Sequence, residues 1–130
     1  MTRFAMTMRI IAILFWTLSA SAAYGQTYAY GLNHCAREFY DPKNSNWISY
    51  ENICTQAIHI TLVGISKPFT SELDVRPGQH KGPSLSANEV KSYGGLAMYA
   101  CPADFFAVDA AERPIILKTA KQFTCKKWGF

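Results

Sequence analysis

Three histidines are the side chains of this sequence best suited to acid–base chemistry near neutral pH. His80 comes shortly after a Pro-Gly pair and next to Lys81, and loops of this kind often carry functional residues. His59 alternates with isoleucines in a strand-like run, which predicts an outward side chain. If the fold brings His59 and His80 within reach of one substrate, the pair fits a small hydrolase of phosphodiesters or glycosides. His34 adjoins Cys35, which we expect in a disulfide and therefore not as a nucleophile.

The sequence contains none of the longer motifs that mark common enzyme classes. There is no Gly-x-Ser-x-Gly elbow, no His-Glu-x-x-His pair and no phosphate-binding glycine loop. Asp74, Asp104 and Asp109 could cleave glycosides as carboxylate pairs, but they lie at expected strand ends, where aspartate usually forms turns. Asp104, Asp109 and Glu112 are too far apart along the chain for a calcium loop. We therefore favour a protein without catalytic residues, metal or cofactor, and keep the histidine hydrolase as an alternative.

A binding function agrees better with the aromatic residues, which make up 14% of the sequence. Aromatic side chains on an exposed sheet face can stack on sugars or contact a peptide. We take Trp47 and Tyr99 as candidate binding residues, together with His80 and Lys81. The predicted partner is an envelope or extracellular protein, or a glycan. A third hypothesis is a protease inhibitor that presents residues 77–83 as its loop.

Residues 1–25 have the three-part pattern of a secretory signal peptide. Arg3 and Arg9 are positive, Ile10–Leu18 is apolar, and Ser19–Gly25 consists mainly of small residues. The apolar run is about half of the roughly 20 residues that are needed to cross a bilayer. We therefore expect cleavage near the end of this segment and a mature protein in the periplasm or outside the cell, with no membrane span.

The mature chain is expected to carry little net charge. Without the two arginines of the signal peptide, 11 basic residues stand against nine acidic ones, which leaves +2. Lysines do gather near the C-terminus, interleaved with aromatic residues: Lys118, Lys121, Lys126 and Lys127. Nucleic-acid-binding domains usually show a much stronger basic bias. We therefore expect no nucleic-acid partner and interpret these lysines as solvent-facing charges on an edge strand.

Four cysteines lie in the mature part, and an even number in a small exported chain predicts two disulfides. Structural zinc sites usually pair cysteines a few residues apart, and no two cysteines here are closer than Cys35 and Cys54. We favour Cys35–Cys54 with Cys101–Cys125, because both loops are short. The nested pairing, Cys35–Cys125 with Cys54–Cys101, is the main alternative among the three connectivities.

The roughly 105 residues after the signal peptide fit one domain. Short strands follow one another at intervals of about ten residues, with turn residues between them. We therefore predict a mainly β fold, a small antiparallel β-sandwich with one short helix and two disulfides. The sandwich covers residues 46–130, and residues 26–45 form an aromatic arm. The expected strands are 47–52, 57–63, 70–75, 96–101, 105–110, 115–119 and 122–125.

Local signals predict several details of these elements. The alternation in Ala57–Val63 indicates a half-buried strand, and Leu96–Cys101, apolar on both faces, indicates a central one. Arg76–Gln79 fits a type II turn with proline second and glycine third. Ser86–Glu89 is a capping box that begins the helix, and Gly94–Gly95 ends it.

The segment Tyr50–Ile60, in which Asn-x-Cys leads into an alternating strand, resembles the opening strand pair of thaumatin-like proteins. The later turn at Pro77–Gly78 is similar as well. This resemblance implies a sandwich topology. It carries over no functional residue, because that family has many more cysteines and an acidic cleft without a counterpart here. The segments Asn46–Cys54 and Gly94–Pro102 also resemble small exported bacterial proteins of unassigned function, which implies a compartment and no mechanism.

Overall fold

The computed structural model describes residues 27–115 and 122–129, and this part of the chain is mainly β, as predicted. It forms three small antiparallel sheets, one short α-helix and a 3-10 helix. Sheet A contains β1 (Tyr28–Ala29), β9 (Thr124–Lys127) and β8 (Phe105–Val108), in that order. Sheet B contains β2 (Ala36–Asp41), β3 (Trp47–Asn52) and β6 (His80–Lys81). Sheet C contains β5 (Thr70–Val75), β4 (Ile58–Gly64) and β7 (Leu96–Pro102); the helices are η1 (Asn33–Cys35) and α2 (Ala87–Ser92).

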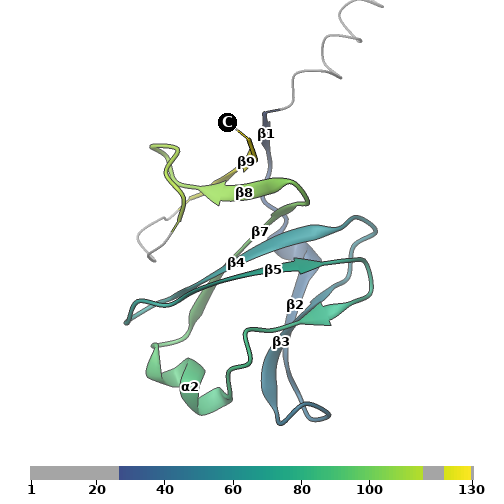
Figure 1. Ribbon diagram of the computed structural model, residues 1–130, viewed down its shortest axis with the longest axis vertical. Coiled ribbons are helices and arrows are strands. Elements are labelled where there is room, and N and C mark those ends of the chain that lie inside the picture. Colours follow the sequence, from purple (N-terminus) through teal and green to yellow (C-terminus); the bar gives the residue numbers. More distant parts are fainter. Residues whose placement is uncertain (1–26, 116–121, 130) are drawn as a thin grey trace, which may run out of the picture.

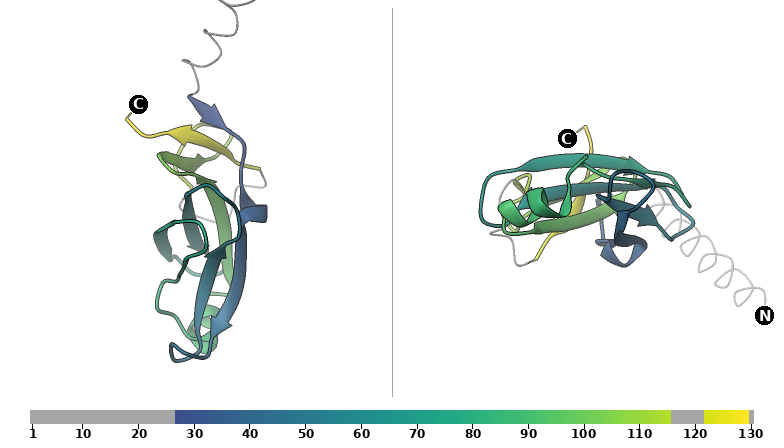
Figure 2. Two further views of the ribbon diagram at one scale, coloured as in Figure 1. Left: turned by 90° about the vertical axis from the view of Figure 1, so that its right-hand side faces the viewer. Right: turned by 90° about the horizontal axis from the view of Figure 1, so that it is seen from below.

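Sheet C takes part in two separate clusters of buried apolar side chains. The first joins it to sheet B and α2, through residues such as Ile60, Tyr50 and Val90. The second joins it to sheet A, through residues such as Tyr99 and Ala107. Figure 1 shows sheet A at one end of the molecule, with α2 and the β2–β3 turn at the other, and Figure 2 gives the side and bottom views. Sheet C is thus the layer on which both other sheets pack, and burial of its two faces is the main force that holds the three together.

The central strand β4 is buried on both faces, whereas the sequence predicts a half-buried strand. Its apolar residues Ile58, Ile60 and Leu62 face the first cluster, as expected. Val63 belongs to the second cluster, and all seven residues of the strand are buried. The expectation that His59 points outward to solvent is therefore wrong, because alternation shows which residues share a face but not whether another sheet covers it.

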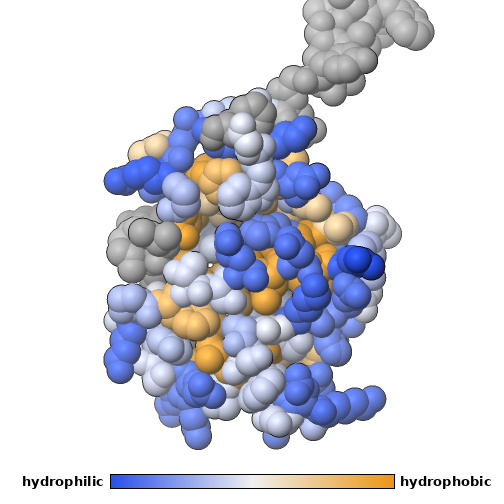
Figure 3. Space-filling view, in the orientation of Figure 1, coloured by the Kyte–Doolittle hydropathy of each residue, from blue (hydrophilic) through white to orange (hydrophobic). Residues whose placement is uncertain are grey.

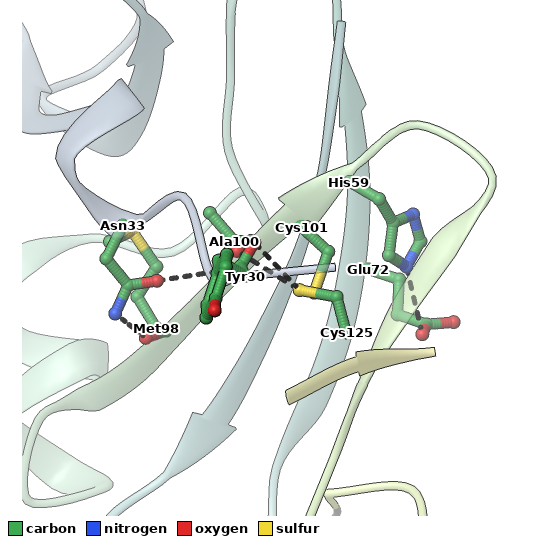
Figure 4. Close-up of a disulfide and its surroundings, with 8 residues drawn as sticks. All are labelled: Tyr30, Asn33, His59, Glu72, Met98, Ala100, Cys101 and Cys125. Carbon is green, nitrogen blue, oxygen red and sulfur yellow. Dashed lines mark hydrogen bonds and ion pairs between the residues drawn. A yellow bond between two sulfur atoms is a disulfide. The ribbon is translucent and has the colours of Figure 1, made fainter. Parts of the chain in front are cut away.

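β7 is an edge strand of sheet C, not the central strand that its composition predicts. It is apolar on both faces because it contributes to both clusters. The Leu32 N–H donates to the Ala100 carbonyl at 2.7 Å. The Asn33 side-chain amide donates to the Met98 carbonyl at 3.2 Å and accepts from the Ala100 N–H at 2.7 Å (Figure 4). This amide takes the place of a neighbouring strand and pairs edge groups of β7.

Both disulfides have the favoured pairing, so the nested alternative is wrong. Cys35 and Cys54 are joined with their Cα atoms 5.1 Å apart, which ties η1 to the loop between β3 and β4. Cys101 and Cys125 are joined with their Cα atoms 5.6 Å apart, which ties sheet C to sheet A (Figure 4). Each of the two contacts between sheets therefore has a disulfide close to it.

The helix signals are confirmed. The Ser86 hydroxyl accepts the Glu89 N–H at 3.3 Å, and the Glu89 carboxylate accepts the Ser86 N–H at 3.2 Å. Gly94 and Gly95 have φ angles of 73° and 94°, which lets the chain leave the helix and enter β7. A helix of six residues is stable only when it packs, and Val90 supplies that contact in the first cluster.

Both ends of the described chain belong to the sheets. The described part of the arm expected at residues 26–45 supplies β1, η1 and β2. β9 is the middle strand of sheet A, so the interpretation of Lys126 and Lys127 as edge-strand charges is wrong. Several predictions lie outside the described residues: the signal peptide, Lys118, Lys121 and most of the strand expected at 115–119. No helix in the described ranges is long and apolar enough to cross a membrane.

Candidate functional site

A small polar pocket lies on sheet B beside the turn between β2 and β3. Its volume is about 80 Å³, and we call it the Trp47 pocket. Three of the four binding residues predicted from the sequence, Trp47, His80 and Lys81, come together there. Its polar lining also includes Asp41, Asn44, Ser49 and Ser84.

The strand register explains why the side chains of Asp41, Trp47, Ser49 and His80 converge. Asp41 is paired with Trp47 across β2 and β3, and His80 is paired with Glu51 across β3 and β6. Side chains alternate along a strand, so Trp47, Ser49 and Glu51 share one face, and the residues between them point into the core. Asp41 and His80 lie opposite members of this set and therefore point to the same outer face.

Ser49 is a buried residue, with only 6% of its surface exposed. Its hydroxyl makes no hydrogen bond to any residue of the described chain. Among the described residues the buried side-chain polar atom without a partner is the Tyr50 hydroxyl, so the Ser49 hydroxyl keeps some access to solvent. Ser49 therefore has both a donor and an acceptor to offer to a group that enters the Trp47 pocket.

Asp41 and His80 define the charge at the pocket. The His80 Nε2 atom lies 3.4 Å from Asp41 Oδ2, and Asp41 Oδ1 accepts the backbone N–H of Lys43 at 3.0 Å. The ring of Phe39 stands edge-on to His80, with 5.3 Å between the centroids. These contacts orient both groups, yet the His80 side chain stays 45% exposed. Lys81 is paired with Tyr50 across β3 and β6, so its side chain points to the opposite face of sheet B from His80.

The loops at the rim of the pocket have unusual backbone conformations. Ser45 and Asn46, in the β2–β3 turn, have φ angles of 56° and 55°, and Ser84 has a φ of 60°. Residues other than glycine in this region cost about 1–3 kcal/mol, and such residues cluster at functional sites. At Gly82 a Cβ atom would lie 2.0 Å from the Ile48 carbonyl oxygen, so only glycine lets the loop pass so close to β3. The rim of the Trp47 pocket therefore contains both strained backbone conformations and a close contact that only glycine allows.

His59 lies in a different environment. Its Nδ1 is 2.8 Å from Asp74 Oδ1 and its Nε2 is 3.2 Å from Glu72 Oε1, both on β5 (Figure 4 shows the contact with Glu72). The Trp128 ring packs edge-on against the imidazole at 6.0 Å between centroids, and the His59 side chain is 8% exposed. Since His59 faces the sheet A side and His80 the outer face of sheet B, the structure does not bring together the two histidines of the hydrolase hypothesis.

Tyr99 is not part of the pocket. It lies on β7 in the second apolar cluster, 7% exposed, with the Phe123 ring 5.1 Å away in an edge-on arrangement. Burial raises the pKa of the Tyr99 hydroxyl above its usual range. Its prediction as an exposed binding residue is wrong, because sheet A covers this face of β7.

The segment 77–83, proposed as an inhibitor loop, is only partly a loop. It begins with the predicted turn, in which the Gln79 N–H donates to the carbonyl three residues earlier at 3.1 Å and Gly78 has a φ of 76°. His80 and Lys81 then form β6 and pair with β3. The segment is therefore anchored to sheet B, and its residues contribute to the Trp47 pocket.

Within residues 27–115 and 122–129, one group of potential metal-ligating atoms lies at the first disulfide. Atoms of His34, Cys35 and Cys54 lie within 4.8 Å of one another. Both sulfurs are joined to each other, so neither is the free thiolate that zinc binds. The group is therefore a structural crosslink with a histidine beside it.

Sequence reasoning missed Asp41, Asn44, Ser49 and Ser84. Asp41 and Asn44 belong to a run of turn-forming residues, and this expected role in a turn gave no sign that they also line a pocket. A signal for Ser49 was present, because the alternation of β3 places it on the same face as Trp47. No comparable signal existed for Ser84, which reaches the pocket only because β6 pairs with β3.

No protein-family model, curated protein or solved structure matches this chain. The resemblances to thaumatin-like proteins and to small exported bacterial proteins therefore stay predictions. The function has to be argued from the geometry of the Trp47 pocket.

Proposed function

We propose that this protein is a small exported binding module that acts without catalysis in the cell envelope or the surrounding medium. Its binding site is the Trp47 pocket. One observation carries the proposal: Trp47, His80 and Lys81, selected from the sequence as binding residues, line one polar pocket together with Asp41 and Ser49.

Two further features support this function. Two disulfides in a chain of this size favour an oxidising compartment, in agreement with the predicted signal peptide. On the face shown in Figure 3, hydrophobic residues form separate patches with hydrophilic residues between them, which favours recognition through local polar contacts. The hydrolase alternative lacks the convergence of His59 and His80 that acid–base catalysis requires.

The proposal is tested by affinity capture from the envelope and the medium of the producing cell. The bait is the oxidised mature protein, and the captured material is analysed by mass spectrometry for proteins and by sugar analysis for glycans. His80→Ala and Trp47→Ala should each reduce the capture strongly, because they remove the aromatic and the imidazole of the Trp47 pocket.

Matched controls separate the pocket from general effects. His34→Ala and Trp128→Ala remove the same residue types from other surfaces and should leave the capture unchanged, whereas reduced and alkylated protein should lose it. The proposal is wrong if the wild type captures nothing at several salt concentrations, or if all four variants capture the same material as the wild type.

A further inference from the structure

We infer that the disulfide between Cys35 and Cys54 is a thiol-exchange site, which a thiol donor opens reversibly while the second disulfide stays closed. Cys54 is the sulfur that the donor attacks, Cys35 is the leaving group, and His34 assists its departure. The inference goes beyond the Trp47 pocket and does not depend on it. Three observations carry it: access to one cysteine, the imidazole beside the pair, and hydrogen bonds that hold the two cysteines together without the disulfide.

The two disulfides differ in their access to solvent. Cys101 and Cys125 are both fully buried, each with 0% of its surface exposed. Cys35 is equally buried, but Cys54 is only half-buried, and the residue before it, Ile53, is 58% exposed. A thiolate must reach a disulfide sulfur in order to react, so access helps to set the rate of exchange. Cys54 is therefore the cysteine, among the four, that a thiol from solution can attack.

His34 places an imidazole at this disulfide. One of its ring nitrogens and the sulfurs of Cys35 and Cys54 lie within 4.8 Å of one another, and His34 is exposed. An imidazole exchanges protons near neutral pH, and a histidine beside a cysteine favours its thiolate. A thiol that is a weaker base leaves a disulfide faster. The position of His34 therefore favours breakage of this sulfur–sulfur bond.

Local hydrogen bonds hold Cys35 and Cys54 near each other independently of the disulfide. The Ile53 N–H donates to the Cys35 carbonyl at 2.9 Å. The Asn52 side chain accepts from the Cys54 N–H at 3.0 Å and donates to the Gln56 carbonyl at 2.7 Å. The same amide donates to a carbonyl of β5 at 3.0 Å, and Asn52 is 1% exposed. Opening the disulfide therefore leaves two thiols side by side in a folded chain, as a reversible exchange requires.

The exchange has two steps. The thiolate of the donor attacks the Cys54 sulfur, a mixed disulfide forms, and the bond to Cys35 breaks with its electron pair on the Cys35 sulfur. His34 takes up the proton that the donor lost and passes it to this sulfur. A second donor thiol then attacks the donor sulfur of the mixed disulfide, and Cys54 leaves and takes the second proton. Two donor thiols are thus oxidised to a disulfide, and Cys35 and Cys54 are reduced to thiols.

The test follows the opening of each disulfide in the oxidised mature protein. The protein is incubated with dithiothreitol as the probe dithiol and quenched with an alkylating reagent at intervals, and mass spectrometry of its peptides shows which cysteines have opened. We expect Cys35 and Cys54 to be alkylated at least about tenfold faster than Cys101 and Cys125, because of the difference in access. Near-ultraviolet circular dichroism, recorded before alkylation, should keep the folded spectrum while only the first disulfide is open.

Variants with one cysteine of the pair identify the attacked sulfur. Cys35→Ala leaves the Cys54 thiol, which should form a mixed disulfide with oxidised glutathione. Cys54→Ala leaves the buried Cys35 thiol, which should form it at least about tenfold more slowly. Both variants lose the same crosslink, so each is the matched control of the other. Urea unfolding of both shows whether each variant is folded, and the rates in the wild type test the inference without them.

His34→Ala separates the imidazole from simple access. It should slow the opening of Cys35–Cys54 by about fivefold at neutral pH and leave that of Cys101–Cys125 unchanged. His34→Gln keeps a polar side chain without proton exchange and should be as slow as His34→Ala. The urea midpoint of both oxidised variants should equal that of the wild type, because His34 is exposed, and this excludes a general loosening of the fold.

The inference is overturned if the two disulfides open at equal rates, if Cys101–Cys125 opens first, or if Cys35→Ala and Cys54→Ala react alike with glutathione. It is also overturned if opening of the first disulfide alone abolishes the folded spectrum, since the bond would then be needed for the fold. Equal rates for His34→Ala and the wild type would show that access alone selects the disulfide and that His34 has no part in the exchange.

Discussion

His59 and His80 lie on strands of the same small domain, and each is close to a carboxylate, yet their surroundings are opposite. His59 has both ring nitrogens near carboxylates of β5, at 2.8 and 3.2 Å, and is covered by Trp128. His80 has one longer contact, 3.4 Å to Asp41, and remains 45% exposed beside a pocket. Both ring nitrogens of His59 therefore lie within hydrogen-bond distance of a carboxylate, whereas His80 has one such contact.

The comparison shows that the role of a histidine on a strand depends on whether another sheet covers its face. Sheet A closes over one face of sheet C and turns His59 into a link between β4 and β5. No described sheet covers the outer face of sheet B, so His80 keeps capacity to meet a ligand. The following predictions, in order of decreasing effect, test this contrast between a satisfied interior and an open surface.

The largest expected effect is on stability at His59. His59→Gln should lower the free energy of unfolding by about 2 kcal/mol, because glutamine cannot reach both carboxylates from one buried position. His80→Gln should change it by less than about 0.5 kcal/mol, since His80 makes one long contact, 3.4 Å to Asp41, from a side chain that is 45% exposed. Urea unfolding of the two variants side by side measures the difference, and equal losses would remove the contrast.

A second effect concerns the aromatic cover of His59. Trp128 stacks on Phe106 with 4.3 Å between the ring centroids and touches the His59 ring by its edge. Trp128→Ala should cost about 1.5 kcal/mol of stability, from lost stacking and from exposure of the imidazole. Trp128→Phe keeps an aromatic ring there and should cost clearly less. If thermal unfolding shows the same loss for both variants, the ring contact is not what stabilises this region.

A third prediction has the opposite sign. The Tyr50 hydroxyl is buried and has no partner at hydrogen-bond distance and angle in the described chain, although the Glu38 carboxylate lies near enough to act on it. Tyr50→Phe should therefore raise the free energy of unfolding by about 1 kcal/mol, whereas removal of the well-bonded His59 lowers it. A decrease for Tyr50→Phe in urea unfolding would show that the hydroxyl does have a partner.

The same variant changes the response to alkaline pH. Burial, and then the charge of the nearby Glu38, raises the pKa of the Tyr50 hydroxyl. A raised pKa in the folded state contributes stability that is complete below about pH 10, the ordinary tyrosine range, and is lost as the pH rises above it. Tyr50→Phe should lose stability less steeply there, which unfolding curves at alkaline pH would measure.

The smallest effect is expected at Asp109, after β8. The Arg113 N–H is the main group that lowers the pKa of this carboxyl; burial opposes it, and the Ala111 N–H adds to it. A lowered pKa gives stability that is present above the ordinary aspartate range, near pH 4, and is lost as the pH falls through the folded-state value. Asp109→Asn should flatten this acid dependence slightly, and an unchanged slope would contradict the prediction.

The features that could be predicted from the sequence depend on neighbouring residues or on short loops. The capping box of Ser86 and Glu89 and the turn at Gly78 are local, and the favoured disulfides close the two short cysteine loops. The strands Trp47–Asn52 and Thr70–Val75 have the predicted bounds, because alternation and flanking turn residues define them.

The features that could not be predicted depend on which strands meet. The burial of His59, the edge position of β7 and the central position of β9 all follow from sheet A closing on sheet C. The same holds for the site. Trp47 and His80 were selected for residue type and expected exposure, but their meeting with Ser49 depends on the pairing of β3 with β6. Sequence patterns carry no direct record of such long-range pairing.

The amide of Asn33 has a consequence for the ageing of this protein. Hydrolysis of that amide to a carboxylate would replace the donor facing the Met98 carbonyl with an oxygen that can only accept. The acceptor for the Ala100 N–H could remain, but the outer edge of β7 would then present an unpaired carbonyl beside a negative charge. Exposed strand edges are templates on which other chains add. We therefore expect deamidated molecules to associate through the β7 edge more readily than molecules that keep the Asn33 amide.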